Sequence, residues 1–453
     1  MDSNIFYSKS ALAWLSLVLE ERFGLKFFIQ HSDSGLAIYI KEIAGSYILF
    51  SKPKNVFRTP QAYVPYTQWD GVSEGWISKV GKPLPAPGVS VLPKPLIVQK
   101  KDHHVIQYDI LGLTYWALNR IEEIDSDKLD SHGRFPAIHS HAYNHKYLDR
   151  PVVDEWLHLL GQVIQRQWPE LRCKQHQFSM LVSHDVDAPS RYGFCSFANM
   201  PRKMVGDLLR CNNYKSIFTA PLIRLNSKNK LHSADSYNTF DWIMSISEDH
   251  NLVSAFYFIC GRTSNVDADY ELEHSAIREL LRRIHLRGHE VGLHPSYGTF
   301  NKPELILLEA QRLRKVMNEE GIHQENLGGR MHYLRWKHPG TLQALSDAGL
   351  SYDSTLGYAD LPGFRCGTCF EYPSFNPVTQ KLLKIRIRPL IVMECTVISS
   401  RYMNLGYSES AMNEIIKLKT YCRQMSGCFT LLWHNSHFTT QSDRELYTDI
   451  IKG

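Results

Sequence analysis

Four residues in three short segments have the types and spacing of a hydrolytic metal site. Asp185 and Asp187 lie one residue apart in SHDVD, His294 lies in GLHPS, and His434 lies in LLWHN. On an extended strand, the two carboxylates project to the same side. One can bind a divalent cation while the other takes a proton from a water molecule that the cation activates. His294 offers a nitrogen ligand suited to zinc, and His434 could protonate a leaving group.

The stretch HEVGLHPSY, residues 289–297, nearly matches the HExxH motif of zinc proteases. That motif requires two histidines four positions apart on one helix face, whereas His289 and His294 are five apart. Val291 and Leu293 alternate with Glu290 and a glycine, which is typical of a strand. We therefore reject the protease interpretation. We expect a short strand with His294 at its end and His289 in a structural hydrogen bond.

Alternating helices and short strands are expected to position these residues. A helix and a glycine precede the strand that ends in His294. The same order recurs at 341–358, where the strand is followed by Asp353, and at 410–436, where it is followed by His434. This alternation predicts an α/β fold with a parallel sheet or barrel covered by helices. Because sites in such folds gather at the C-terminal ends of strands, strands that end in His or Asp indicate a site.

Composition excludes several classes of protein. The 453 residues have a hydrophobic share of 43% and a net charge of +5, which fits a globular protein of two or three domains and does not favour nucleic-acid binding. No apolar run is long enough to predict a membrane span. The apolar stretch 11–19 has no small-residue cleavage site after it, so we interpret it as a helix of the fold and expect a cytoplasmic protein.

Other common site signatures are absent or incomplete. No GxxxxGK[ST] or GxGxxG sequence occurs, which argues against a P-loop and a dinucleotide site. The nine cysteines are scattered and odd in number, which is typical of reduced thiols. Cys366 and Cys369 form one CxxC without a matching second pair, so we favour ordinary loop cysteines over a zinc or redox site. Histidines 132, 139, 141 and 145 follow no metal-ligand spacing and are expected to be structural or exposed.

We predict three parts of the chain. Residues 1–150 are expected to form a smaller α+β domain of unknown role, residues 151–175 a connecting helix, and residues 176–453 the domain that carries the site. Within the last part, residues 201–232 form a basic insertion with seven Lys/Arg and one acidic residue. This insertion could contact an anionic substrate or a membrane surface that carries phosphate groups. The alternative is a solvated loop with one amphipathic helix.

The segments SHDVD, GHEVGLHPS, LRW with AGLSYDSTLGY, and LLWHN occur in the order and style of the polysaccharide deacetylases of carbohydrate esterase family four. The resemblance covers about residues 176–436. It implies a distorted (β/α) barrel as the catalytic domain, and the removal of acetyl groups from N-acetyl sugars with a divalent metal, for which zinc is expected. The preceding α+β domain resembles an uncharacterised module of bacterial proteins of surface-glycan synthesis.

The resemblance also implies residue roles. Asp185 would be the catalytic base, Asp187 and His294 would be metal ligands, His434 would be the general acid, and Arg335 would be the arginine of the third motif. By the residues alone, either Arg335 or Arg330 could orient a carboxylate. The residues expected to contact substrate are Trp433, Tyr297, Arg330 and Asp353, and for Asp353 a simple turn role is left open.

This chain departs from the family pattern at one position. The family's second motif usually carries another histidine four residues after the first, where this chain has Gly298. Either water or another histidine would then complete the metal site. His332, in GRMHYLRW just ahead of the third motif, is the candidate for a third protein ligand.

The sequence therefore predicts a metal-dependent hydrolase that removes an acetyl group from an N-acetylated sugar of a bacterial surface glycan or its precursor. The expected partner is a glycan or glycolipid substrate, with peripheral membrane contact through residues 201–232 and no nucleic acid. A hydrolase of another acyl amide or ester is the alternative within enzymes. A catalytically degenerate glycan-binding protein, suggested by Gly298, is the alternative from another class.

Overall fold

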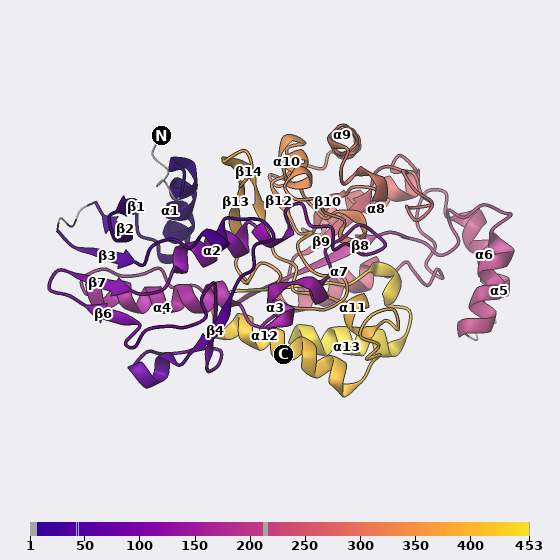
Figure 1. The fold of residues 1–453 in the computed structure, drawn as a ribbon. Helices are drawn as coiled ribbons and strands as arrows, with labels where there is room; N and C mark the ends of the chain where they lie inside the picture. The colour runs from indigo at the N-terminus through magenta and orange to yellow at the C-terminus, as the bar shows by residue number, and fades with distance from the viewer. Residues whose placement is uncertain (1–6, 42, 44, 212–215, 453) are drawn as a thin grey trace.

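The computed structural model describes residues 7–41, 43, 45–211 and 216–452. The chain is elongated, with an N-terminal sheet at one end, a larger sheet with its helices in the middle, and a helical hairpin at the other end (Figure 1). Among the described residues, no helix combines the length and apolar character that a membrane crossing requires.

The N-terminal part is built on a five-stranded sheet in the order β1-β2-β3-β7-β6. A separate antiparallel pair, β4 and β5, lies beside it. The strands of the N-terminal part are β1 (Phe27–Ser32), β2 (Gly35–Ile40), β3 (Tyr47–Phe50), β4 (Tyr66–Trp69), β5 (Leu84–Pro87), β6 (Ile97–Gln99) and β7 (His103–Ile106). Its helices are α1 (Lys9–Phe23), α2 (Ile110–Leu118), α3 (His141–Asn144) and α4 (Val152–Gln167).

The apolar stretch 11–19 forms the middle of α1. Ser8 accepts a hydrogen bond from the amide of Ala11 and caps the helix start, and Gly24 ends the helix with a left-handed φ of 70°. Trp14 is buried, and its Nε1 donates to the carbonyl of Pro373 at 2.7 Å. The stretch therefore belongs to the fold, as the sequence predicted.

The larger sheet has nine strands in the order β13-β14-β12-β11-β10-β9-β8-β16-β15. All neighbours are parallel except β13 and β14, and the sheet curls into an open half-barrel. This confirms the α/β class and a barrel-like sheet. The strands are β8 (Ser179–Val186), β9 (Ser254–Ile259), β10 (Glu290–His294), β11 (Gly328–Gly329), β12 (Tyr352–Asp353), β13 (Tyr372–Asn376), β14 (Lys381–Ile387), β15 (Val392–Met393) and β16 (Cys428–Leu432).

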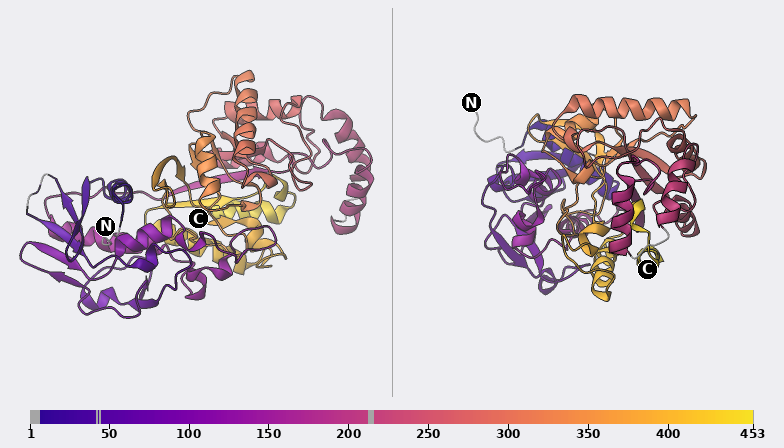
Figure 2. Two further views of the ribbon diagram at one scale, coloured as in Figure 1. Left: turned by 45° about the horizontal axis from the view of Figure 1, so that its top comes forward. Right: turned by 90° about the vertical axis from the view of Figure 1, so that its right-hand side faces the viewer.

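Amphipathic helices cover the half-barrel. On α8, the residues Ile277, Leu280, Leu281 and Ile284 recur at helical spacing and are fully buried, while arginines occupy the outer face. Figure 2 shows α5 and α6 standing away from the rest of the chain. The helices are α5 (Met200–Cys211), α6 (Ser216–Asn226), α7 (Phe240–Asp249), α8 (Ser275–Leu286), α9 (Pro303–Glu319), α10 (Gly340–Asp347), α11 (Glu394–Ile398), α12 (Glu409–Gln424) and α13 (Gln441–Lys452).

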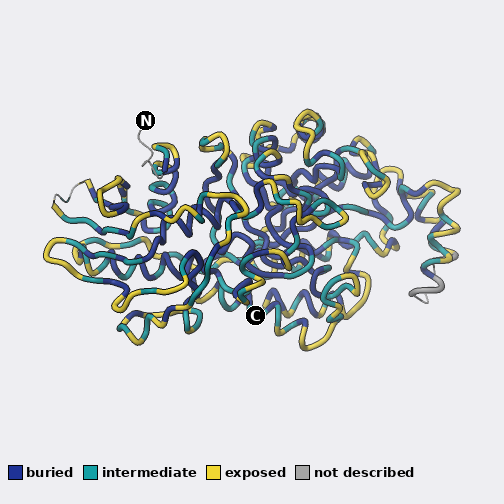
Figure 3. The backbone as a smooth tube through the Cα atoms, in the orientation of Figure 1, coloured by how far each residue is buried: buried dark blue, intermediate teal, exposed yellow. Residues whose placement is uncertain are grey.

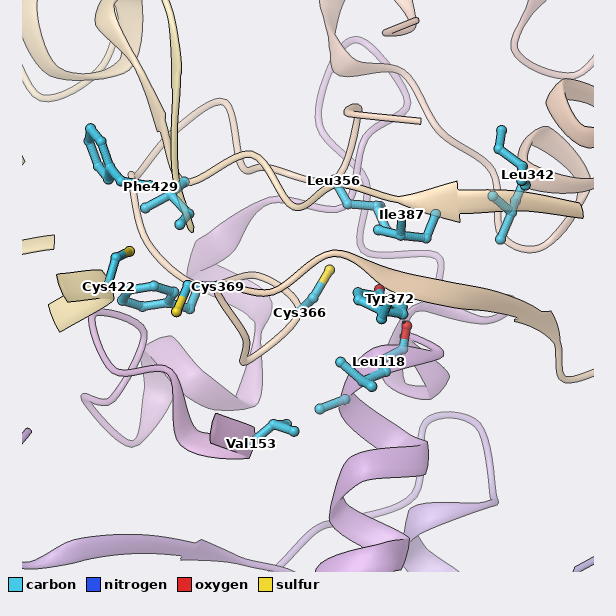
Figure 4. Close-up of a cluster of buried hydrophobic side chains, with 14 of the residues drawn as sticks. Leu118, Val153, Leu342, Leu356, Cys366, Cys369, Tyr372, Ile387, Cys422 and Phe429 are labelled. Atoms are coloured by element: carbon cyan, nitrogen blue, oxygen red, sulfur yellow. Dashed lines mark hydrogen bonds between the residues drawn. The ribbon is translucent and has the colours of Figure 1, made fainter. Parts of the chain in front are cut away.

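One continuous cluster of buried apolar side chains joins the N-terminal part to the half-barrel. Figure 4 shows Leu118 and Val153 of the N-terminal part facing Cys366, Cys369 and other side chains of the half-barrel. The helix expected to connect the two domains, α4, packs against β3, β5 and β7. The division at 150–175 remains a prediction, and the two parts share their apolar core across it.

The thiols support the reading of ordinary cysteines. Cys366 and Cys369 are buried, and every cysteine whose side chain the structure describes is free. Burial raises the pKa of both thiols. Because the thiolate is the reactive and metal-binding form, these side chains are inert packing residues.

Candidate functional site

The curl of the half-barrel brings the ends of β8, β10 and β16 together. Asp185 lies near the end of β8 and Asp187 directly follows it, His294 ends β10, and His434 follows β16. The Nε2 atom of His294 lies 3.3 Å from Oδ1 of Asp187, and the Nε2 atom of His434 lies 3.7 Å from Oδ2 of the same carboxylate. Side chains separated by almost 250 positions in the sequence therefore meet around one aspartate.

His332 completes a group of three candidate metal ligands with Asp187 and His294. Its Nε2 atom lies 3.7 Å from Oδ1 of Asp187. The three ligand atoms, Asp187 Oδ1, His294 Nε2 and His332 Nε2, are buried, and none has a hydrogen-bond partner among the described residues. A buried polar atom without a partner is costly, and here three such atoms lie close together. Two imidazoles and a carboxylate fit a divalent metal, with room for water or substrate as further ligands.

Hydrogen bonds behind the two histidines fix which nitrogen faces the group. Nδ1 of His294 donates to the carbonyl of Arg330 at 2.6 Å, and Nδ1 of His332 donates to Oδ1 of Asp267 at 2.8 Å. Since each acceptor can only accept, both Nε2 atoms are left with a free lone pair when the rings are neutral. Such support of the ligands by neighbouring groups is usual at metal sites.

The electrostatics of the group follow from its charges. Burial raises the pKa of Asp187, but His332 and His294 outweigh this and hold the pKa well below its usual value. Burial lowers the pKa of His332, while Asp187 and Asp267 raise it to about 9. The group is thus negative enough to attract a proton or another cation to its centre.

Asp185 is held by an arginine and not by the metal group. Nη1 of Arg330 donates to Oδ1 of Asp185 at 2.7 Å, and Nη2 of the same guanidinium donates to Oγ of Ser183 at 2.8 Å. Both Asp185 and Arg330 are buried. The other oxygen of Asp185 lies 3.7 Å from Nε2 of His294, so it faces the same space as the metal group.

His434 is paired with a buried carboxylate. Its Nδ1 donates to Oε1 of Glu394 at 2.5 Å, and its amide donates to the same oxygen at 2.9 Å. Burial lowers the pKa of His434, but Glu394 outweighs this and raises the pKa well above its usual value. Glu394 therefore favours the protonated ring of His434, whose Nε2 lies 3.7 Å from Oδ2 of Asp187.

A cavity of about 310 Å³ opens over these side chains. Asp185, Asp187 and His434 lie in its wall, together with the two metal-ligand histidines. Arg134, from the N-terminal part, also lines it and is held by Asp130 and by the carbonyl of Tyr333. The N-terminal part therefore contributes to the wall of the same cavity.

A second group of metal-type ligands lies beside the first and consists of Glu394, Cys395, His434 and His437. In this group, Nδ1 of both histidines already donates to Oε1 of Glu394, at 2.5 and 2.8 Å. These Nδ1 atoms are used in hydrogen bonds, whereas Oδ1 of Asp187 and the Nε2 atoms of His294 and His332 have no partner among the described residues. The first group is therefore the better candidate for a resident metal.

Arg335 donates to backbone carbonyl oxygens, and its role as the arginine of the third motif stays a prediction. Its Nε donates to the carbonyl of His132 and its Nη1 donates to the carbonyl of Tyr297, at 2.7 and 2.6 Å. Arg330, five residues earlier, holds Asp185 instead. The chain turns sharply between the two arginines, because Tyr333 and Leu334 adopt left-handed φ angles of 63° and 55°.

Three of the residues expected to contact substrate are buried away from the cavity. Trp433 is fully buried, and its Nε1 donates to the carbonyl of His437 at 3.1 Å. Asp353 is fully buried and accepts the amide of Thr355, so the turn interpretation fits it. Arg330 contacts Asp185 and not the cavity space.

Tyr297 keeps a position near the site. Its hydroxyl lies 3.1 Å from Nδ1 of His132, and its ring stands edge-on to that of His332. Gly298 donates its amide to Oγ1 of Thr263 at 2.7 Å. His332, and not a side chain at 298, therefore contributes the third candidate ligand.

Other histidines are structural. Nδ1 of His289 accepts the amide of Ser254 at 3.1 Å, which confirms the expected structural hydrogen bond. Nδ1 of His141 lies 2.5 Å from the hydroxyl of Tyr147, and the ring of His145 stacks on Tyr66.

The sequence reasoning missed three polar residues that support the site: Ser183, Asp267 and Glu394. Ser183 is the first residue of SHDVD on β8, and nothing in the sequence around it indicates a role in the site. Asp267 lies in the loop after β9, eight residues beyond the end of the strand, so its position does not mark a strand end. Glu394 follows the short apolar run LIVM, so a carboxylate after a strand was the one signal that could have identified it.

Comparison with known proteins gives a partial picture. A model of a family of unknown function (DUF7033) matches residues 9–169. No protein with a curated function matches the chain.

Several solved structures resemble this chain over part of its length. One, whose title names a polysaccharide deacetylase from Mycobacterium smegmatis, is 14% identical with a TM-score of 0.39, and the alignment covers 62% of this chain and 84% of that one. The Puue allantoinase is 11% identical with a TM-score of 0.35, over 61% and 84%. Another, whose title names a polysaccharide deacetylase from Pseudomonas aeruginosa PAO1, is 12% identical with a TM-score of 0.35, over 61% and 84%. At these TM-scores, no residue role is transferred from them.

Proposed function

We propose that this protein is a metal-dependent hydrolase that removes the acetyl group from an N-acetylated sugar of a surface glycan or its precursor. The observation that carries the proposal is the group of three buried, unpartnered ligand atoms on Asp187, His294 and His332. They lie beside a carboxylate held by an arginine and a histidine held by a glutamate, in the wall of one cavity.

Asp187, His294 and His332 would hold the cation, for which zinc is proposed because two imidazoles and one carboxylate suit it. When bound, zinc polarises a carbonyl and lowers the pKa of a water molecule. The residues behind the ligands, Arg330 through its carbonyl and Asp267 through its carboxylate, keep both Nε2 atoms directed at the cation.

Asp185 would act as the general base. One of its oxygens is fixed by Arg330, and the other faces the group of ligands. It would take a proton from the attacking water while the new C–O bond forms at the acetyl carbonyl. Arg330 keeps the carboxylate in place.

His434 would act as the general acid. Glu394 holds its Nδ1–H and favours the charged ring, so that Nε2 carries the proton that faces the cavity. When the C–N bond breaks, His434 would give this proton to the leaving nitrogen. Water and the N-acetyl group are thereby converted to acetate and a free amino sugar.

The Asp185→Asn variant tests this assignment. We expect turnover of N-acetylated oligosaccharides, followed as acetate release, to fall by about 10²–10⁴-fold, because the base is removed. Zinc content, measured by elemental analysis, should remain at the wild-type value, because the ligand atoms are intact.

The paired variants Asp187→Asn and His294→Ala should lose the metal as well as turnover. Asp269→Asn, an exposed aspartate in the loop after β9, serves as the control and should keep both. Full turnover in Asp185→Asn would remove the proposed base. Release of an acid other than acetate would redirect the proposal to another acyl amide or ester, and a chain with neither metal nor turnover would favour a glycan-binding protein.

A further inference from the structure

The hairpin of α5 and α6 carries an unpartnered apolar stripe. Phe218, Leu222 and Leu225 recur at spacings of four and three on α6, which places them on one face of the helix. Their exposed fractions are 82%, 49% and 58%. Phe197, just before α5, and Val205, within it, are also more than half exposed. In Figure 3 the hairpin stands at the end of the molecule with much of α6 exposed.

The opposite face of α6 already has its partners. Ala220 and Ile223 are fully buried with Tyr192 and Cys195 in a small separate core at the base of the hairpin. The single acidic residue of the insertion, Asp207, is taken up by Arg191 and Tyr192 at the same base. The exposed stripe is therefore not the inner face of α6, and the hairpin is fixed to the rest of the chain without it.

Basic residues lie on the hairpin and directly after it. Arg202 of α5 and Lys228 and Lys230 after α6 are exposed, and the one acidic residue of the insertion, Asp207, is engaged by Arg191. A helix with one apolar face, flanking Lys and Arg residues and almost no acidic residues is the type that lies in the interface of a membrane. The basic residues match the phosphate charges of anionic lipids, each contributing about fivefold in affinity.

The hairpin also follows directly on the candidate site. Residues 188–199 lead from Asp187, at the C-terminal end of β8, to α5. The connection to the hairpin therefore starts at a strand end whose Asp187 lines the cavity.

We propose that the α5–α6 hairpin docks the protein onto the surface of an anionic lipid bilayer, with Phe218, Leu222 and Leu225 in the interface and Arg202, Lys228 and Lys230 at the headgroups. The inference about the substrate rests on the proposed deacetylase function: the substrate would be a glycan attached to a lipid of that bilayer. The docking itself does not depend on the chemistry of the site.

The experiment uses the full chain with two kinds of vesicle, phosphatidylcholine alone and phosphatidylcholine with phosphatidylglycerol, and measures bound protein by co-flotation. We expect binding to the anionic vesicles that weakens as salt is added. The variant Phe218→Ser/Leu222→Ser/Leu225→Ser should bind the anionic vesicles at least about tenfold more weakly than the wild type does. The variant Arg202→Gln/Lys228→Gln/Lys230→Gln should lose the preference for anionic vesicles.

Two matched variants control for the number and kind of changes. Tyr63→Ser/Val91→Ser/Leu286→Ser replaces three highly exposed apolar residues outside the hairpin, and Lys26→Gln/Lys52→Gln/Lys82→Gln replaces three exposed lysines outside it. Both should bind anionic vesicles as the wild type does. Equal binding of the hairpin variants and their controls would overturn the proposal, as would wild-type protein that floats with neither vesicle. Self-association that the apolar hairpin variant abolishes, in protein that does not bind vesicles, would assign the stripe to a second copy instead.

The two proposals can fail separately. The apolar hairpin variant should release acetate from a soluble N-acetylated oligosaccharide at the wild-type rate, because its changes lie outside the cavity. Asp185→Asn should lose acetate release and keep vesicle binding. Vesicle binding without any acetate release would leave the docking surface standing and remove the proposed chemistry.

Discussion

Two buried charged clusters of this protein differ in whether their polar atoms have partners. Between the N-terminal part and the half-barrel, Glu123 accepts from Nε of Arg120 at 2.9 Å and from Nε and Nη2 of Arg365 at 3.0 and 2.6 Å. Arg120 also donates to the hydroxyl of Tyr358 at 3.1 Å. No atom of these three charged side chains is left unpaired, whereas Asp187, His294 and His332 each have a buried atom without a partner.

The difference separates structure from function. A buried ion pair that is fully hydrogen-bonded needs no ligand to complete it, and its loss lowers the stability of the fold. A cluster that leaves several ligand atoms unpaired at one point is incomplete without a ligand. The first cluster is expected to respond to unfolding conditions, and the second to a metal.

Breaking the satisfied cluster should have the largest effect on stability. Glu123→Gln leaves Arg120 and Arg365 buried without their anion, and we expect about 3–5 kcal/mol of lost unfolding free energy, measured by urea denaturation. The matched control is Glu21→Gln. Glu21 also joins the two parts through a bidentate pair with Arg386, but about a third of each side chain is exposed, so the loss should stay below about 1 kcal/mol. Equal losses in the two variants would contradict the distinction.

Filling the unsatisfied cluster should have the next largest effect. Zinc at about a hundred times its dissociation constant is expected to raise the unfolding free energy by about 2.7 kcal/mol, because it binds the folded chain only. Thermal unfolding with and without a chelator measures this increment. His294→Ala should abolish the increment, while His289→Ala should keep it, since the ring of His289 contacts the amide of Ser254 and the carboxylate of Glu248 and is not one of the candidate ligands. An undiminished zinc increment in His294→Ala would place the metal elsewhere.

Acid should act on the satisfied cluster with a smaller effect. Burial raises the pKa of Glu123, but Arg365 and Arg120 outweigh this and lower the pKa from 4.5 to about 2. Because the folded-state pKa lies below the unfolded one, this stabilisation is complete above about pH 4.5 and is lost as the pH falls towards 2. Urea unfolding at several pH values should therefore show a steeper loss on acidification in the wild type than in Glu123→Gln. Parallel curves would show that Glu123 is not the titrating group.

Several features of the site follow from short-range sequence patterns. The alternation in HEVGLHPS excludes a helical HExxH arrangement, and β10 occupies residues 290–294. Asp185 and Asp187 share one side because alternate residues of a strand do so, and strands that end in His or Asp meet because parallel strands place their ends at one edge. These properties depend on neighbours a few residues apart, so the sequence alone suffices to predict them.

Other features depend on contacts between distant segments. Whether Arg330 or Arg335 holds Asp185 is decided by a turn with left-handed angles at Tyr333 and Leu334, in a segment without glycine there to indicate it. The burial of Trp433, the partnership of Glu394 with His434 and the approach of His332 to Asp187 all result from how the open sheet curls. Sequence spacing determines which residues stand at strand ends, but only tertiary packing determines which of them meet, because side chains on separate strands carry no local record of one another.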